Sequence, residues 1–456
     1  MRVHHLFFST NAEQQTLHRR ISPTVAQMEI QQGRWQDLRD FLVVELAQVS
    51  GYAVSSWLQG SYKFGTQIRP AKLGAEFDID LGLYYNWAGG PDATGEDPTG
   101  LKAQVQAALE AYAEEAGDDV KGVDRPAKER CARIRFSGDF HIDVPAYHLD
   151  PKRDARELAT ETRGWEISDP KALYLWFQRK FDRDDTAQVR RLIRYMKMWS
   201  ALSLEPPPSS VLITVLVSEA YLQATADAVD GDDLALRTIA AAVRGRLAGQ
   251  SRVENPVNRA ENLNRMDTAQ TAAFLSGLAD LERIADHAIA AQTEAATALA
   301  WTNAFAHFFP AASERAENRN ALVPIAFDPQ IWVEARPEIG GAVFRGVNEI
   351  GVIPKACSIT FTLQNAHLLP PGAQIRWIVR NEGEEAELTN DMGHIGVVGP
   401  VAVENSAYRG THSMDVVVIS AQGLVLGSRR VRVQVSGMKM PPRNPSRPGW
   451  ARKARR

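Results

Sequence analysis

The stretch of sequence that decides the fold is Glu76-Phe77-Asp78-Ile79-Asp80-Leu81-Gly82. Apolar and acidic residues alternate in it, and successive side chains of a β-strand point to opposite faces of the sheet. The pattern predicts a strand over residues 76–84 whose apolar side chains enter the core. Asp78 and Asp80 then share the other face, on a rigid element.

A third acidic residue follows in Ile142-Asp143-Val144, on the second strand of a hairpin predicted over residues 133–144. Three carboxylates held close together repel one another, and a hard divalent cation with oxygen ligands relieves that repulsion. Asp78, Asp80 and Asp143 are therefore predicted as catalytic and metal-binding residues, with two Mg²⁺ ions as cofactors and Mn²⁺ as the alternative ion. A strand with one solvated acidic face is the other interpretation of the same pattern.

A glycine and a serine precede the acidic strand. Gln59-Gly60-Ser61 follows a strand predicted over residues 52–58 and opens a short segment that ends at Thr66. Glycine allows the backbone to approach a phosphate closely, and free N–H groups and a hydroxyl supply hydrogen bonds. A phosphate-binding segment and the acidic residues thus fall in consecutive elements.

These motifs, taken in order, resemble a known family. Residues 59–66, 76–82 and 141–147 are similar to the polymerase-β-type nucleotidyltransferase signature of bacterial cGAS/DncV-like enzymes, the second-messenger synthases of CBASS anti-phage systems. The resemblance implies a mixed α/β (α+β) core with a helical second lobe and a nucleotide cleft between them. It implies nucleotide-binding roles for Gln59, Gly60, Ser61, Lys197 and Ser210. A solvated basic helix face is the alternative for Lys197, and an ordinary helix cap is the alternative for Ser210.

The C-terminal part consists of short β-rich runs separated by Gly, Pro, Asn and Asp, which predicts a small antiparallel sandwich. The segment from Trp377 to Gly383 and the later Tyr408-Arg409-Gly410-Thr411-His412 resemble the adenylyl/guanylyl-cyclase-and-SMODS (AGS-C) sensor domain. The resemblance implies a nucleotide-sensing role, in which Tyr408, Arg409 and His412 suit base stacking or phosphate contact. A packed core around Trp377 and a structural turn at Gly410 are the alternative.

A length of 456 residues predicts several domains. The predicted limits are 1–150 for the nucleotidyltransferase core with N-terminal helices, 151–310 for the helical lobe that closes the nucleotide cleft, 327–437 for the β-sandwich and 438–456 for a mobile basic tail. The N-terminal helices are predicted to break near Pro23 and Gly33. A protein that ends near Phe309 is expected to stay folded, because the sandwich would have its own core.

Charge and cysteine content limit the partners and the compartment. The formal net charge of −3 leaves no global attraction to nucleic acid or to an anionic membrane, so a long nucleic-acid acceptor is not expected. Two distant cysteines indicate a reducing compartment. No export signal or membrane span is recognised, which predicts a bacterial cytoplasmic protein with no membrane partner.

The predicted function is synthesis of a cyclic oligonucleotide second messenger from NTPs, ATP and as a second candidate GTP, with release of pyrophosphate. The family resemblance also implies an effector protein that senses the product. Two alternatives stay open: an RNA-tailing or linear oligoadenylate-type nucleotidyltransferase, and a non-catalytic nucleotide-binding sensor.

Overall fold

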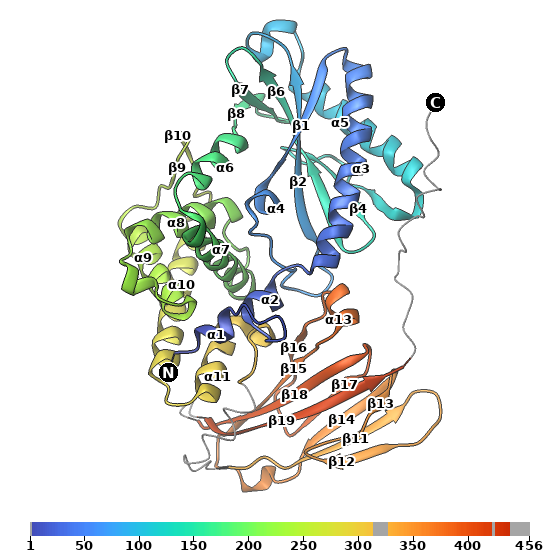
Figure 1. Ribbon diagram of the computed structural model, residues 1–456, viewed down its shortest axis with the longest axis vertical. Helices are drawn as coiled ribbons and strands as arrows, with labels where there is room; N and C mark the ends of the chain where they lie inside the picture. The colour runs from blue at the N-terminus through green and yellow to red at the C-terminus, as the bar shows by residue number, and fades with distance from the viewer. Residues whose placement is uncertain (1, 313–326, 422–424, 438–456) are drawn as a thin grey trace. The chain divides into compact units, whose positions relative to one another are not determined.

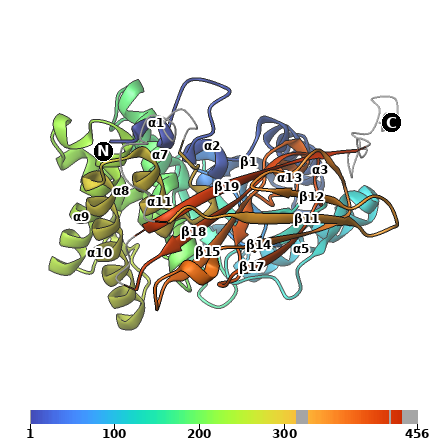
Figure 2. The same cartoon turned by 90° about the horizontal axis from the view of Figure 1, so that it is seen from below.

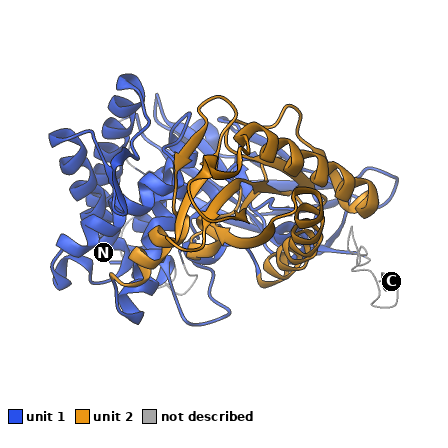
Figure 3. Cartoon of the chain, turned by 90° about the horizontal axis from the view of Figure 1, so that it is seen from above, with its two compact units in different colours: residues 1–24, 71–73, 181–437 blue, residues 25–70, 74–180, 438–456 orange. Residues whose placement is uncertain are grey.

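The computed structural model describes residues 2–312, 327–421 and 425–437. The chain forms two compact units (Figure 3). We call residues 25–70 and 74–180 the sheet unit, and residues 1–24, 71–73 and 181–437 the helix–sandwich unit. The predicted basic tail, residues 438–456, lies outside the described residues. This grouping differs from the predicted domain limits at residues 1–24, which pack with the helical part, and at residues 151–180, which pack with the sheet.

The sheet unit is built on one mixed sheet with strand order β3-β4-β5-β2-β6-β7-β8, and β1 also pairs with β2 (Figure 1). Its strands are β1 (Ala53–Gln59), β2 (Phe77–Asn86), β3 (Val120–Val123), β4 (Ala132–Phe136), β5 (Phe140–Val144), β6 (Ala146–Asp150), β7 (Ala155–Ala159) and β8 (Trp165–Ile167). Its helices are α3 (Val25–Ser50), α4 (Gly60–Phe64), α5 (Pro98–Ala116) and α6 (Pro170–Gln178), with η1 (Pro91–Thr94) and η2 (Gly117–Asp119) as short 3₁₀ turns.

The apolar face of β2 lies in the main core of this unit, together with buried leucines of α3 and α5. The predicted alternation holds from Phe77 to Leu81, where Asp78 and Asp80 face away from the core. From Gly82 to Tyr85 every residue is buried, because both faces of the sheet are covered there. The alternating half of β2 is therefore the half that can present side chains to solvent or a ligand.

The predicted helix break at Gly33 is wrong, since α3 runs without interruption from Val25 to Ser50. A glycine inside a helix costs only about 1 kcal/mol relative to alanine, and Leu38, Leu42 and Leu46 of the same helix are fully buried. Tertiary packing therefore outweighs the local preference of Gly33. The break near Pro23 is confirmed, because α2 ends at Ile21.

The helical part of the second unit contains α1 (His4–Phe7), α2 (Leu17–Ile21), α7 (Arg183–Ser203), α8 (Ser210–Gln223), η3 (Ala226–Val229), α9 (Asp232–Gly249), α10 (Thr268–Ala290), α11 (Glu294–Phe305) and η4 (Ala306–Phe308), with the short hairpin β9 (Glu254–Asn255) and β10 (Asn258–Asn262). Figure 2 shows α9 and α10 side by side. Among the described helices, none combines the length and the apolar run that crossing a lipid bilayer requires.

The C-terminal part of this unit is the predicted sandwich, and its strand pairings are antiparallel except that of β13 with β19. One sheet has the order β12-β11-β14-β17 and the other the order β13-β19-β18-β15-β16. The strands are β11 (Ile331–Pro337), β12 (Phe344–Val347), β13 (Ile353–Pro354), β14 (Cys357–Leu363), β15 (Gln374–Arg380), β16 (Gly393–Ile395), β17 (Val401–Asn405), β18 (Gly410–Ile419) and β19 (Val425–Ser436), with η5 (Ala366–Leu368) and α13 (Glu384–Leu388) between them. Trp377 is fully buried in the core between the sheets.

Two buried arginines join the sandwich to the helical part. Arg380 of β15 is 3% exposed, donates from Nε to the carbonyl of Phe309 at 3.0 Å, and is paired with Asp415 of β18. Arg20 of α2 is 1% exposed and donates to the carbonyls of His307 at 3.1 Å and Met392 at 2.9 Å. Because buried polar groups are costly without their partners, these bonds couple the two parts energetically.

These hydrogen bonds between the helical part and the sandwich argue against the expectation that a protein ending near Phe309 stays folded. Truncation there would remove Arg380 and Met392 and leave the buried arginine of α2 with one carbonyl fewer. We therefore expect the helical part to lose stability without the sandwich.

We predict that Arg380→Met lowers the stability of the helix–sandwich unit by roughly 3 kcal/mol, because Asp415 loses a buried partner and the Phe309 carbonyl loses its donor. A fall in melting temperature of roughly 6 °C would accompany that loss. Arg376→Met is the matched control, since Arg376 is exposed on the same strand. Equal melting temperatures for the two variants would contradict the proposed coupling.

Candidate active site

The antiparallel pairing of β1 with β2 brings the Gly-Ser segment to the acidic strand. Gln59, the last residue of β1, lies opposite Asp80. The next residue, Gly60, has a φ of +55°, and a Cβ added there would lie 1.9 Å from Oδ2 of Asp80. Only glycine fits both the backbone conformation and this close approach. The backbone at the start of α4 thus lies against the Asp80 carboxylate.

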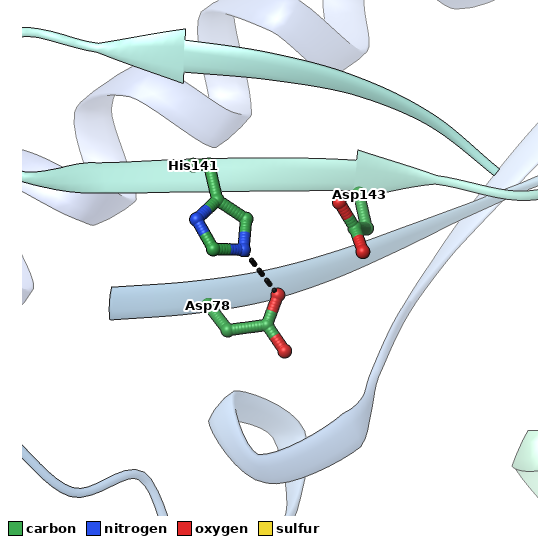
Figure 4. A group of neighbouring side chains, drawn as sticks. All are labelled: Asp78, His141 and Asp143. Atoms are coloured by element: carbon green, nitrogen blue, oxygen red, sulfur yellow. Dashed lines mark hydrogen bonds and ion pairs between the residues drawn. The ribbon is translucent and has the colours of Figure 1, made fainter. Parts of the chain in front are cut away.

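The parallel pairing of β2 with β5 places the other acidic residues. Asp78 lies beside His141 and Asp80 beside Asp143. Asp78, His141 and Asp143 each offer one metal-binding atom, and these atoms all lie within 4.8 Å of one another. Figure 4 shows His141 and Asp143 projecting from one strand toward Asp78 on the other. Asp80 is not one of these three residues, and its carboxylate lies against Gly60.

Asp143 is held by positive charge. Its carboxylate accepts two hydrogen bonds from Arg133, at 2.5 and 2.7 Å, and lies 3.6 Å from Nζ of Lys128. Arg133 is its direct neighbour on β4, and the Asp143 side chain is only 14% exposed. The guanidinium offsets part of the repulsion among the carboxylates and fixes the orientation of this one.

Asp78 is oriented by a histidine. Nε2 of His141 lies 2.9 Å from Oδ1 of Asp78, and Nδ1 lies 3.0 Å from Glu76, which is paired in turn with Arg135 at 2.5 Å. Loss of solvation raises the pKa of Asp78, but the hydrogen bond and charge of His141, with the charges of Arg133 and Lys128, leave that pKa below its ordinary value. The carboxylate is therefore ionised at neutral pH, as a metal ligand must be.

The amide of Gln59 is occupied within the protein. Its Nε2 donates to the hydroxyl of Tyr84 at 2.8 Å, and its Oε1 accepts from Tyr147 at 3.1 Å. The two tyrosine rings stack with centroids 4.8 Å apart. Gln59 is buried and fixes the end of β1, so its side chain contacts these tyrosines rather than solvent. Ser61 is half-buried in the first turn of α4.

Lys197 and Ser210 belong to the helix–sandwich unit. Lys197 of α7 is only 6% exposed and lies among buried apolar residues, so the interpretation as a solvated basic face is wrong. Ser209, not Ser210, caps α8, because its side chain accepts a hydrogen bond from the N–H of Leu212. Ser210 is the first residue of the helix and is exposed, which leaves a ligand role compatible with its position.

The carboxylates fit a hard divalent cation. Asp78 and Asp143 supply closely spaced oxygen atoms, and the Asp78 side chain is 53% exposed, which leaves it accessible from solvent. Carboxylate oxygens are the ligands that Mg²⁺ and Mn²⁺ prefer. Both ring nitrogens of His141 lie within hydrogen-bond distance of a carboxylate, Nε2 of Asp78 and Nδ1 of Glu76, so its position suits orientation of Asp78.

Sequence reasoning did not assign the residues that support the carboxylates. His141 lies in one of the quoted motifs and Arg133 begins the predicted hairpin, but neither residue was given a role from the sequence. Their roles follow from strand register, which places Arg133, Asp143 and Asp80 in one row across β4, β5 and β2, and Arg135, His141 and Asp78 in the next. The available signal was a shared spacing. Arg133 and Arg135 are two residues apart, as are His141 and Asp143 on the other strand of the predicted hairpin.

Carboxylates on adjacent strands of a mixed sheet, beside a Gly-Ser segment at the end of a third strand, define a nucleotidyltransferase of the polymerase-β type. Residues 54–147 match the family described as "Cyclic GMP-AMP synthase DncV-like, nucleotidyltransferase domain". Residues 314–436 match the "Adenylyl/Guanylyl and SMODS C-terminal sensor domain". The chain is therefore similar to the DncV-like nucleotidyltransferases over residues 54–147 and to the AGS-C sensor domain over residues 314–436.

One relative is similar over almost its whole length, another over less than half of its length, and a solved structure has the same fold. The cyclic GMP-AMP synthase of Escherichia albertii is 27% identical over 436 residues, which cover 94% of this chain and 95% of that protein. The enzyme of the same name from Vibrio cholerae is 27% identical over 188 residues, 31% of this chain and 41% of its own. The apo structure of Vibrio cholerae DncV has the same fold, with a TM-score of 0.58 and 20% identity over 67% of this chain and 96% of that chain.

We predict that Gly60→Ala lowers nucleotidyltransferase activity at least a hundredfold. A Cβ at this position would displace the Asp80 carboxylate, and misplacement by about 1 Å at a reacting centre costs roughly a hundredfold in rate. Gly51→Ala is the control, because Gly51 also has a positive φ, +74°, but nothing lies within 4 Å of its added Cβ. An equal loss of activity in both variants would attribute the effect to backbone strain. Full activity of Gly60→Ala would contradict the predicted displacement of Asp80.

We predict that His141→Phe weakens Mn²⁺ binding about tenfold, since loss of a residue that orients a metal ligand commonly has that effect. Electron paramagnetic resonance titration of Mn²⁺ measures it without turnover. His141→Gln, which keeps an N–H donor for Asp78, should recover part of the affinity. His148→Phe is the control, because His148 is also buried and bonded to a glutamate, at 2.9 Å, but in another part of the sheet. Unchanged Mn²⁺ affinity in folded His141→Phe would exclude the positioning role.

Proposed function

We propose that this protein joins NTPs, purine NTPs in the first place, into a cyclic oligonucleotide and releases pyrophosphate. The observation that carries the proposal is the set of carboxylates on the paired strands β2 and β5, with Asp80 lying against the Gly60 backbone. The alignment with the Escherichia albertii cyclic GMP-AMP synthase supports it, because it extends over 94% of this chain.

In this proposal Asp78, Asp80 and Asp143 hold two divalent cations. Such ions, when bound, activate the attacking 3′- or 2′-hydroxyl and neutralise charge on the triphosphate. The chain's own residues prepare this arrangement: Arg133 keeps both oxygens of Asp143 in place, and His141 fixes one oxygen of Asp78. Preorganised ligands of this kind lower the cost of reaching the reactive geometry.

The triphosphate is proposed to contact Gly60, Ser61, Lys197 and Ser210. A buried ammonium such as that of Lys197 gains more from a phosphate than a solvated one does, because the surrounding dielectric is lower. The Gln59 side chain is proposed to shape the site rather than to contact the triphosphate, because its amide is hydrogen-bonded to Tyr84 and Tyr147. Transfer of the hydroxyl proton to Asp143 is part of the same proposal.

The biological setting is proposed on the family assignment. A cyclic nucleotide product acts through a receptor, so we propose a product-sensing effector protein and a role in CBASS anti-phage signalling in the bacterial cytoplasm. The structures of relatives bound to GTP or 3′-deoxy GTP support NTPs as substrates of this chain as well.

Incubation of the full chain with all four NTPs and Mg²⁺, followed by pyrophosphate measurement and mass spectrometry of the products, tests the function. We predict a cyclic product whose formation falls at least a hundredfold in Asp78→Asn and in Asp143→Asn, because each removes an anionic metal ligand. Asp118→Asn, at an exposed position, is the control.

Other results of this experiment would support one of the alternative functions or exclude the proposed metal ligands. Linear or RNA-attached products would identify the tailing or oligoadenylate-type enzyme. NTP binding without pyrophosphate release by the unmodified protein would identify a non-catalytic sensor. Full activity of both aspartate variants would exclude the proposed metal ligands.

A further inference from the structure

Two cationic side chains lie beside Asp143, and they differ in how firmly they are held. The guanidinium of Arg133 is bonded to both carboxylate oxygens, at 2.5 and 2.7 Å, and its side chain is 15% exposed. Nζ of Lys128 lies 3.6 Å from Oδ2, which is longer than a hydrogen bond, and its side chain is 40% exposed. Arg133 is thus fixed, whereas the Lys128 ammonium is free to move away from Asp143 toward solvent.

The backbone that carries Lys128 is anchored by a buried lysine. Nζ of Lys102, on α5, donates to the carbonyls of Lys128 at 2.6 Å and Glu129 at 3.0 Å, and it pairs with Glu161 at 2.6 Å. Lys102 is 3% exposed, and these three acceptors are the partners that a buried ammonium requires. The carbonyl of Glu129 also accepts from the N–H of Glu161 at 3.0 Å. The main chain at residues 128–129 is therefore held in place, while the Lys128 side chain is not.

A divalent cation on Asp143 would change the surroundings of this ammonium. Nζ of Lys128 lies 3.6 Å from a carboxylate oxygen, and Mg²⁺ binds at about 2.1 Å from such an oxygen. The two positive charges would then be close enough to repel each other. Lys128 and a divalent cation therefore compete for Asp143.

Phosphate is the anion that suits the displaced ammonium. The proposed substrates are NTPs, whose triphosphate binds beside the divalent cations. Lysine binds phosphate as a compact charge on a flexible stem, so it needs no fixed orientation. Arg133 is less suited to this contact, because its guanidinium is already bonded to Asp143.

We propose that Lys128 has two partners in turn. Its ammonium pairs with Asp143 before a cation binds, and it contacts a phosphate oxygen of the nucleotide once cations are bound. Because the nucleotide draws this positive charge away from the cation, cation and nucleotide each favour binding of the other. The proposal rests on the proposed function in one respect, since it takes an NTP as the ligand.

Two affinities measured without turnover test the proposal. Electron paramagnetic resonance titration gives the affinity for Mn²⁺ without nucleotide. Isothermal titration in saturating Mn²⁺ gives the affinity for ATP and GTP analogues with a methylene group between the α- and β-phosphates. We expect Lys128→Gln to bind Mn²⁺ about fivefold more tightly, since a like charge is removed. It should bind the analogues about tenfold more weakly, the value of a charge-assisted hydrogen bond to phosphate.

Two further variants control for charge and position. Lys128→Arg keeps the charge and should keep both affinities close to those of the unmodified chain. Lys152→Gln removes the same charge at an exposed position beyond the end of β2 that pairs with Leu149, so neither affinity should change.

A purely structural role of Lys128 would lower both affinities of Lys128→Gln together with its melting temperature. That result, an unchanged analogue affinity, or equal shifts in Lys152→Gln would each overturn the proposal. Pyrophosphate release by the unmodified chain tests the proposed function separately. Its absence alongside the two opposite shifts would contradict that function and leave the role of Lys128 in nucleotide binding supported.

Discussion

The parallel pairing of β2 with β5 is the constraint on which the candidate active site depends. It places Asp78 beside His141 and Asp80 beside Asp143, so acidic residues about 60 positions apart in the chain share one face of the sheet. Such a cluster would be unstable alone, because like charges at this spacing repel. Arg133 on the next strand offsets part of this charge, and His141 orients Asp78. Asp78 and Asp143 are thus held in position before any cation binds, and the cluster keeps a net negative charge that a divalent cation can neutralise.

The neighbouring strand adds a steric constraint to this electrostatic one. β1 ends opposite Asp80, and Gly60 allows the backbone to turn directly against that carboxylate. Gln59 is hydrogen-bonded to two tyrosine hydroxyls, which holds the residue before the turn in place. Packing on the other face by α3 and α5 holds β2 itself. The carboxylates therefore project from a layer whose position is determined on both faces.

The C-terminal sandwich is not independent of the helical part of its unit. Arg20 and Arg380 are buried between the helical part and the sandwich. They donate hydrogen bonds to main-chain carbonyls of both parts. Because a buried guanidinium that loses a partner destabilises the fold by several kcal/mol, a change in the sandwich can influence the helices.

The sequence by itself determined the acidic strand, the hairpin with Asp143, the break at Pro23 and the β-rich C-terminal part, because period-two alternation and turn residues act locally. It also supported the family, through the order of three short motifs. The roles of His141 and Arg133, the occupied amide of Gln59 and the burial of Lys197 required the tertiary structure. Each depends on strand register or on packing between segments distant in the chain, and local sequence carries no information about which strands become neighbours. Gly33 shows the same limit, since its local preference was overruled by the buried leucines that follow it on α3.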